Sequence, residues 1–272
     1  MSVDAGTTTL TVMANGAAVP CMLAGIDREG VDPVVLLPGV GGTIESDFAF
    51  LLPLLARTHR VLAVDLRYGI DATPTLGALV GQLAEVLRQT LPGRRVTLVG
   101  FSVGATVAAE FSAANPAVGA LVLVAPVLRA SYRHRMVARL RASMSASDRD
   151  ALQSLDRFTA YSPSFLQAAV PEESAVEGTA AKHRLFVDTD LTESVSRIGV
   201  PTLVVGCTQD DLAGVDQARM FFVSLPNARY AEIDSGHAVI SERPAEVLAI
   251  IREFAADPVR HRPGFVLDRA RP

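Results

Sequence analysis

The sequence VTLVGFSVGATV, at residues 96–107, is the clearest indication of the fold. The apolar run at 96–99 predicts a buried strand, and the small residues from Gly104 onward predict a helix that follows it directly. Between them stands Gly100-Phe101-Ser102-Val103-Gly104, a Gly-x-Ser-x-Gly sequence. On a sharp strand-to-helix turn, flanking glycines leave room for close packing and the serine hydroxyl is presented at the edge of the sheet. We therefore expect Ser102 to be a reactive serine at the end of a buried strand.

Short apolar runs recur on both sides of this stretch. The first two are joined through Asn15-Gly16, which is typical of a hairpin, and most of the others do not alternate, as expected of strands buried on both faces. Helical patterns separate them, for example at residues 76–89 and 104–114. We predict an α/β fold with a mostly parallel, eight-stranded twisted sheet and helices on both faces. The expected strands are residues 8–13, 19–24, 34–37, 61–65, 96–99, 120–124, 202–205 and 228–233.

One segment departs from this rhythm, because residues 127–195 show no strand signal and contain two amphipathic stretches, at 132–144 and 147–161. We interpret the segment as a helical cap, or lid, inserted after the sixth strand. Residues 1–126 and 196–256 then form the α/β core. The tail, residues 257–272, alternates arginine and proline and is expected to be flexible.

Composition sets the broad class of the protein. With 49% hydrophobic residues in a chain of 272, a mainly disordered protein is excluded, and a net charge of −4 argues against nucleic acid as a partner. The longest charge-free run is interrupted by Pro116 and Pro126, and the N-terminus does not resemble a secretory signal, so we expect a cytoplasmic protein without a membrane partner. We expect Cys21 and Cys207 to be two reduced, buried thiols, and the alternative is a single disulfide, which a chain of this size does not need.

A serine hydroxyl needs a general base, and the base needs an orienting partner. His237 follows the strand expected at 228–233, and the paired carboxylates Asp210 and Asp211 follow the strand expected at 202–205. Open α/β sheets place their sites at the carboxyl ends of strands, so these side chains are expected to meet Ser102 there.

The chain resembles the α/β-hydrolase superfamily from the first hairpin to about Phe254. Residues 36–42 are similar to the family's oxyanion loop, 100–104 to its nucleophile elbow, 206–211 to its acid loop and 235–237 to its histidine loop. The resemblance implies that Ser102 is the nucleophile and His237 the general base, with an acid from the aspartate pair.

The resemblance also implies an oxyanion hole built from the backbone amides of Val40 and Val103. The chain departs from the family pattern at two positions. The family often has His-Gly where this chain has Pro38-Gly39, a change that leaves the Val40 amide in place. The family's acid is often followed four residues later by a proline, and counting back from the corresponding Gly214 favours Asp210 over Asp211.

No cofactor or metal is expected. The glycines at 39–42 lack the third glycine of a dinucleotide fingerprint and no Walker lysine follows them, and no His, Cys or Asp cluster has metal-ligand spacing. The remaining histidines, His59, His134, His183 and His261, are expected at the surface.

The cap segment is rich in arginine. A solvated helix face is the simpler interpretation, and the alternative is a surface for an anionic partner such as a carboxylate, a phosphopantetheine group or an acyl carrier protein. The arginines are Arg129, Arg133, Arg135, Arg139 and Arg141.

The resemblance thus implies a serine hydrolase that cleaves an ester or thioester of a hydrophobic small molecule through an acyl-enzyme. The alternative is a tailoring enzyme of a small-molecule pathway: a carrier-protein thioesterase, a lactone or carbon–carbon bond hydrolase, or an acyltransferase. The alanine-rich composition with a single lysine, Lys182, is typical of GC-rich bacterial genomes, where such pathways are frequent. A ligand-binding receptor on the same fold is the non-enzymatic hypothesis.

Overall fold

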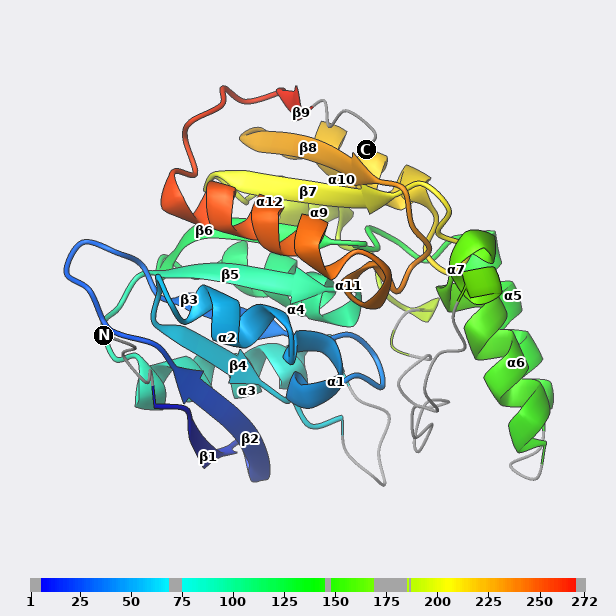
Figure 1. The fold of residues 1–272 in the computed structure, drawn as a ribbon, viewed down its shortest axis with the longest axis horizontal. Coiled ribbons are helices and arrows are strands. Elements are labelled where there is room, and N and C mark those ends of the chain that lie inside the picture. The colour runs from blue at the N-terminus through cyan, green and yellow to red at the C-terminus, as the bar shows by residue number, and fades with distance from the viewer. Residues whose placement is uncertain (1–5, 69–74, 145–147, 169–184, 186, 268–272) are drawn as a thin grey trace.

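The computed structural model describes residues 6–68, 75–144, 148–168, 185 and 187–267 (Figure 1). Within these residues nine strands form one sheet, in the order β1-β2-β4-β3-β5-β6-β7-β8-β9. The pairs β1–β2 and β2–β4 are antiparallel and all other neighbours are parallel. The strands are β1 (Thr8–Ala14), β2 (Ala17–Ala24), β3 (Val34–Leu37), β4 (Val61–Val64), β5 (Val96–Phe101), β6 (Val118–Val124), β7 (Thr202–Cys207), β8 (Ala228–Ile233) and β9 (Val266–Leu267).

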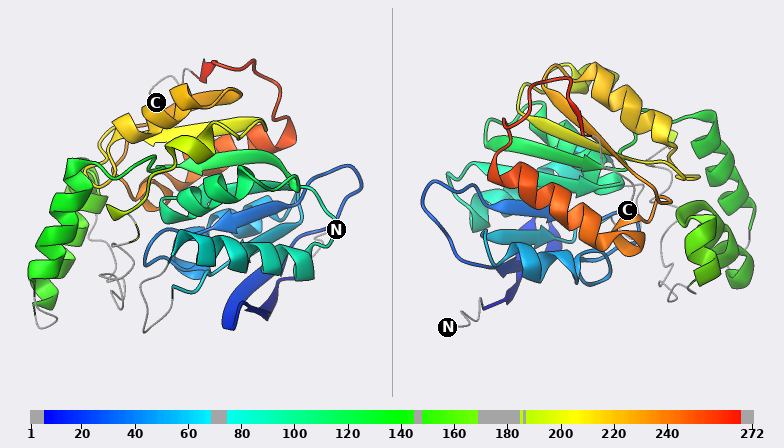
Figure 2. Two further views of the ribbon diagram at one scale, coloured as in Figure 1. Left: turned by 180° about the vertical axis from the view of Figure 1, so that it is seen from behind. Right: turned by 45° about the horizontal axis from the view of Figure 1, so that its top comes forward.

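Helices cover both faces of the sheet, as Figures 1 and 2 show from opposite sides. Every residue of β3, β4, β5 and β7 is buried, which explains why these strands read as continuous apolar runs. One face is covered by α3 (Leu76–Thr90), α4 (Val103–Ser112), α9 (Thr192–Val195) and α10 (Val215–Ser224), and the other by α1 (Ile44–Phe48), α2 (Leu51–Leu55), α11 (Val239–Glu242) and α12 (Pro244–Ala256).

The opening hairpin forms where Asn15-Gly16 predicts it. Asn15 and Gly16 have φ values of 51° and 80°, the left-handed conformation that a two-residue turn of this kind needs at both positions. The turn fixes the register of β1 against β2, and β2 in turn pairs with β4.

Among the described residues, the chain between β6 and β7 forms α5 (Tyr132–Ser143), α6 (Arg149–Ala160) and α7 (Pro163–Ala168) before it reaches α9. Figure 1 shows α5 and α6 projecting beyond the carboxyl ends of the central strands. Ser131 caps the first turn of α5, and an ion pair between Arg141 and Asp156 joins α5 to α6. The two amphipathic stretches of the sequence are therefore helices, as predicted. Residues 169–184, which belong to the same insertion, lie outside the described residues.

The C-terminal segment differs from the prediction, because the sheet has nine strands and not eight. Val266–Leu267 pairs in parallel with Tyr230 and Ala231 on the free edge of β8. The buried Arg229 holds the approach to this strand by donating from Nε to the His261 carbonyl oxygen at 2.7 Å. A strand of two residues has no pattern of its own, so the sequence could not show it.

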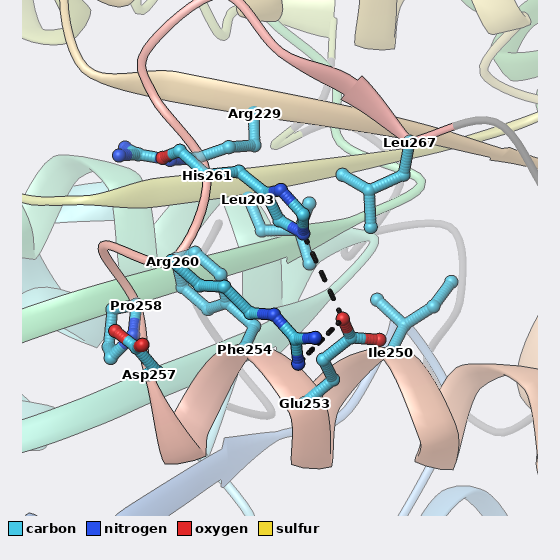
Figure 3. Close-up of a pocket in the computed structure, with 10 residues that line it drawn as sticks. All are labelled: Leu203, Arg229, Ile250, Glu253, Phe254, Asp257, Pro258, Arg260, His261 and Leu267. Carbon is cyan, nitrogen blue, oxygen red and sulfur yellow. Dashed lines mark hydrogen bonds and ion pairs between the residues drawn. The ribbon is translucent and has the colours of Figure 1, made fainter.

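Figure 3 shows this segment packed between α12 and β8, where the side chains of Arg260 and His261 approach Glu253. Arg260 and His261 lie 3.5 and 3.8 Å from the Glu253 carboxylate, and the His261 ring stacks on Phe265 with 4.3 Å between centroids. The described part of the tail, up to residue 267, is therefore attached to the core. Residues 268–272 lie outside the described residues.

The surface position expected for His59 and His134 is wrong, because both are buried. His59 is held by Thr58, whose hydroxyl lies 2.9 Å from Nδ1. A single polar residue carries no periodicity, so its burial depends on packing that the sequence does not reveal. His261 is partly exposed, and His183 lies outside the described residues.

Both cysteines are unpaired and buried. Burial, helped by the charge of Asp65, raises the pKa of the Cys21 thiol to about 12. In the described part of the chain, no helix is long and apolar enough to cross a membrane.

Candidate active site

Ser102 lies on a strained turn between β5 and α4. Its φ and ψ are 54° and −115°, a conformation that side-chain-bearing residues rarely adopt, and its amide donates to the Val124 carbonyl oxygen at 2.9 Å. A Cβ at Gly100 would collide with the Gly104 carbonyl group, and one at Gly104 would collide with the Leu37 carbonyl oxygen. The two glycines of the motif are therefore required by packing around the turn.

The structure joins Ser102, His237 and Asp210 by hydrogen bonds. His237 Nε2 lies 2.8 Å from Ser102 Oγ, and His237 Nδ1 lies 2.8 Å from Asp210 Oδ2. All three side chains are buried. The other oxygen of Asp210 accepts from the amides of Leu212 and Ala213 at 2.9 and 2.7 Å, which fixes the carboxylate.

The environment of Asp210 favours its ionised form. Burial opposes the charge, but the charge of His237 and its hydrogen bond, together with the backbone amides that Asp210 accepts, outweigh burial and lower the pKa of Asp210. An ionised Asp210 at Nδ1 keeps the proton of a neutral imidazole on that nitrogen. His237 Nε2 is then free to accept the Ser102 proton.

Asp211 occupies a different place. Its side chain is 50% exposed and pairs with Arg133 of α5, with 2.7 Å between Oδ1 and Nη1. The choice that the sequence left between the two aspartates is therefore made by the loop after β7, which turns Asp210 inward and Asp211 toward the inserted helices.

The loop after β3 packs against the serine turn. A Cβ at Gly39 would lie 3.4 Å from Ser102 Cβ, so the loop passes directly beside the nucleophile candidate. Among the hydrogen bonds of the described residues, none is donated by the amides of Val40 or Val103. The two amides expected to form an oxyanion hole are thus available, one beside Ser102 in the chain and the other on the adjoining loop.

The acid and histidine loops are tied to each other. The side chains of Thr208 and Gln209 both donate to Asp234 Oδ1 at 2.8 Å, and the Gln209 amide donates to the Ser235 carbonyl oxygen at 2.9 Å. Phe101 lies beside the His237 ring, with 5.5 Å between centroids. The hydrogen bonds hold the loop that carries His237, and Phe101 packs beside the ring itself.

Three polar residues near the site were not singled out from the sequence as site residues. Asp47 of α1 accepts from the Gly39 amide at 2.9 Å, and Glu242 of α11 accepts from the Gly236 amide at 3.1 Å. His134 of α5 is 6% exposed, and its Nδ1 accepts from the Ser131 amide while Nε2 has no partner among the described residues. Burial, together with the charge of His237, lowers the pKa of His134 to about 4. None of the three lies in a motif, and only their tertiary contacts reveal them.

No group of three or more His, Cys, Asp or Glu side chains in the described residues is arranged to hold a metal ion. The described groups that meet at this site are the Ser102 hydroxyl, the His237 imidazole and the Asp210 carboxylate.

The fold and this arrangement define the class of protein. The family model described as "Alpha/beta hydrolase family" matches residues 34–250, and the chain therefore belongs to the α/β-hydrolase family and is a hydrolase.

Two curated relatives cover most of the chain. The pyrrolizixenacetamide deacetylase of Xenorhabdus hominickii is 29% identical over 246 residues, which span 84% of this chain and 92% of the relative. The monoacylglycerol lipase ABHD6 of Rattus norvegicus is 24% identical over 264 residues, spanning 84% of this chain and 77% of the relative.

Solved structures show the same fold. The enol-lactonase from Burkholderia xenovorans LB400 superposes with a TM-score of 0.79 at 20% identity, covering 91% of this chain and all of the other, 100%.

Proposed function

We propose that this protein is a serine hydrolase that cleaves an ester, or a related acyl bond, of a hydrophobic small molecule through an acyl-enzyme on Ser102. The observation that carries the proposal is the chain of two 2.8 Å contacts from Asp210 through His237 to Ser102. A nucleophile, a base at its hydroxyl and a carboxylate at the far side of the base are the parts that serine acyl transfer needs.

The residues act in a fixed order in this mechanism. Ser102 Oγ attacks the substrate carbonyl while His237 Nε2 takes the hydroxyl proton, and Asp210 stabilises the imidazolium that results. The amides of Val40 and Val103 bind the tetrahedral oxyanion. His237 then gives the proton to the leaving group, and a water deprotonated by the same imidazole releases the acyl group from Ser102.

Two observations support an apolar substrate. Tyr132, Met136 and Leu140 recur every four residues along α5 and are exposed, so this helix presents an apolar stripe. The second is the name of a relative, a lipase for monoacylglycerols. We propose that α5 to α7 act as a cap that binds the hydrophobic part of the substrate.

The name of the other relative favours a second substrate class. An acetamide deacetylase transfers an acyl group from nitrogen to water, and the same serine, base and oxyanion site would serve that reaction. A carrier-bound thioester is a third class. Two arginines of α5 are engaged elsewhere, since Arg133 pairs with Asp211 and Arg141 with Asp156, which reduces the basic surface available to an acidic carrier.

The test is hydrolysis of three matched series with acyl chains of two to twelve carbons: p-nitrophenyl esters, p-nitroanilides and thioesters. We expect the wild type to turn over at least the esters, with a chain-length optimum, and Ser102→Ala to fall to the background rate. The ratio of ester to anilide turnover decides between esterase and amidase.

A fluorophosphonate probe provides a control that does not depend on the acyl group. It should label wild-type protein at Ser102 and leave Ser102→Ala unlabelled. A folded wild type that neither turns over any series nor reacts with the probe would overturn the proposal and favour a ligand-binding role for this fold.

A further inference from the structure

The loop between β3 and α1 forms a tight turn around Val40. The Gly42 amide donates to the Gly39 carbonyl oxygen at 3.2 Å, which closes a four-residue turn, residues 39–42. Gly41 has φ of 75°, a value that the third position of a type II turn requires and that glycine adopts without strain. The turn therefore presents the Val40 amide from a defined backbone conformation.

A single carboxylate, that of Asp47, contacts both ends of this turn. Asp47 Oδ2 accepts from the Gly39 amide at 2.9 Å, and a Cβ placed on Gly42 would collide with the same oxygen. Ser46 Oγ donates to the other oxygen, Oδ1, at 3.0 Å and orients the carboxylate. The capping box of Thr43 and Ser46 holds the first turn of α1 in place beneath it.

We propose that Asp47 is a positioning residue for the reaction, which holds residues 39–42 so that the Val40 amide faces the oxyanion formed at Ser102. The inference rests on the proposed function. The contacts that support it are short. Asp47 accepts a hydrogen bond from the Gly39 amide, and Gly39 packs against Ser102. Val40 directly follows Gly39 in the chain. Moving an oxyanion donor by about 1 Å is enough to lower a rate by roughly 10²-fold.

The charged and titratable groups around Asp47 come from several elements. Burial raises the pKa of Asp47 above its ordinary value. The hydrogen bonds from the Gly39 amide and the Ser46 hydroxyl and the charge of His237 offset only part of this rise. The interaction with His237 agrees with a carboxylate close to the reacting groups. Among the described residues, the titratable groups that interact electrostatically with Asp47 or His237 include Asp65, Tyr68, His134, Tyr161 and Asp210.

The experiment uses three variants that separate the hydrogen bond from the charge. Asp47→Ala removes the acceptor and should lower kcat by about 10- to 100-fold with little change in KM, because a displaced oxyanion donor affects the transition state more than the bound ester. Asp47→Asn keeps an oxygen for the Gly39 amide and should stay within about threefold of the wild type. Gly42→Ala leaves Asp47 in the chain but displaces its carboxylate, and should reproduce the loss seen in Asp47→Ala.

Two control variants test whether the loss of any carboxylate on α1, or the replacement of any glycine, lowers kcat. Glu45→Gln removes an exposed carboxylate from the same helix, and Gly77→Ala fills open space on α3, so both should keep wild-type kcat. Thermal unfolding of every variant shows which of them fold.

A second readout is independent of turnover. Amide hydrogen exchange in the peptide that contains residues 38–42 should be faster in Asp47→Ala than in the wild type and unchanged in Asp47→Asn. If the wild type lacks both turnover and fluorophosphonate labelling, the proposed function fails while the exchange result still tests the anchoring of the loop. Unchanged kcat and exchange in Asp47→Ala, or equal losses in the Asn and Ala variants, would overturn the role of Asp47.

Discussion

Glu242 Oε2 accepts a hydrogen bond from Ser162 Oγ at 2.6 Å, although 80 residues separate the two in the chain. The other oxygen, Oε1, accepts from the amides of Ser162 and Gly236 at 2.8 and 3.1 Å. Because Gly236 directly precedes His237, one carboxylate connects the end of α6 with the loop that carries the histidine. The Ala238 amide reinforces the connection by donating to the Ala160 carbonyl oxygen at 2.8 Å.

Replacing Glu242 should therefore disturb His237 from a distance. We expect Glu242→Ala to lower kcat by about tenfold, since two amides lose their acceptor and the histidine loop loosens. Glu242→Gln retains Oε1 and should lose less than about threefold. Steady-state kinetics on the best ester measure both, with Glu246→Ala on the neighbouring helix as the control. A Gln variant as impaired as the Ala variant would contradict this account.

The two neighbouring aspartates should differ sharply in kinetics. Asp210→Asn removes the charge beside His237 Nδ1 and allows the wrong imidazole tautomer, so we expect kcat to fall by about 10⁴-fold. Asp211→Asn breaks only an exposed ion pair with Arg133 and should change kcat less than about threefold. The pair is its own control, because the variants differ by one position in the same loop. Equal losses would show that Asp210 does not orient the base.

His134 should make the protein acid-sensitive. Its pKa in the folded protein is about 4, below the ordinary value of 6.5, so between these values the unfolded chain binds a proton that the folded protein excludes. The stability that neutral His134 allows is thus fully present above pH 6.5 and is lost as the pH falls toward 4. The loss amounts to at most about 3 kcal/mol.

Urea unfolding of wild type and His134→Gln between pH 8 and 4 measures this contribution. The wild type should lose stability relative to the variant as the pH falls. Burial raises the pKa of Asp65 to about 6, so protonation of this carboxyl stabilises the folded state as the pH falls, opposite to the effect of His134. Asp65 is present in both proteins, so its contribution cancels when their stabilities are compared. His261→Gln serves as the control for a partly exposed histidine. Parallel pH curves for wild type and His134→Gln would contradict the prediction.

The ion pair between Arg141 and Asp156 should matter more for folding than the pair between Arg133 and Asp211. Asp156→Ala leaves the buried Arg141 guanidinium without its partner, and we expect a loss of about 3 kcal/mol. Arg133→Ala breaks an exposed pair and should cost less than about 1 kcal/mol.

Hydrogen exchange in α5 and α6, together with thermal unfolding, measures both losses. The double change Arg141→Met and Asp156→Leu removes both charges and should be more stable than Asp156→Ala alone. If the single and double variants are equally unstable, the loss comes from packing and not from the stranded charge.

The fold class and most of the candidate site could be predicted from the amino-acid sequence. Strands buried on both faces must be apolar throughout, and a serine on a strand-to-helix turn needs small neighbours. Both features are visible in the sequence around Ser102, so the strand and the turn could be recognised there. The order Ser102, Asp210 or Asp211, His237, with each residue at the carboxyl end of a strand, followed from that pattern. The eight strands with apolar runs were found within two residues of their expected ends.

Features that depend on a single contact could be seen only in the folded structure. Asp210 and Asp211 are chemically identical, and only the turn after β7 directs one to His237 and the other to Arg133. The short β9, the burial of His134 and the contacts of Asp47 and Glu242 have no periodicity in the chain. Periodic apolar burial is repeated along a strand or helix and is therefore visible in sequence, whereas a single polar contact between distant segments exists only once the backbone has brought them together.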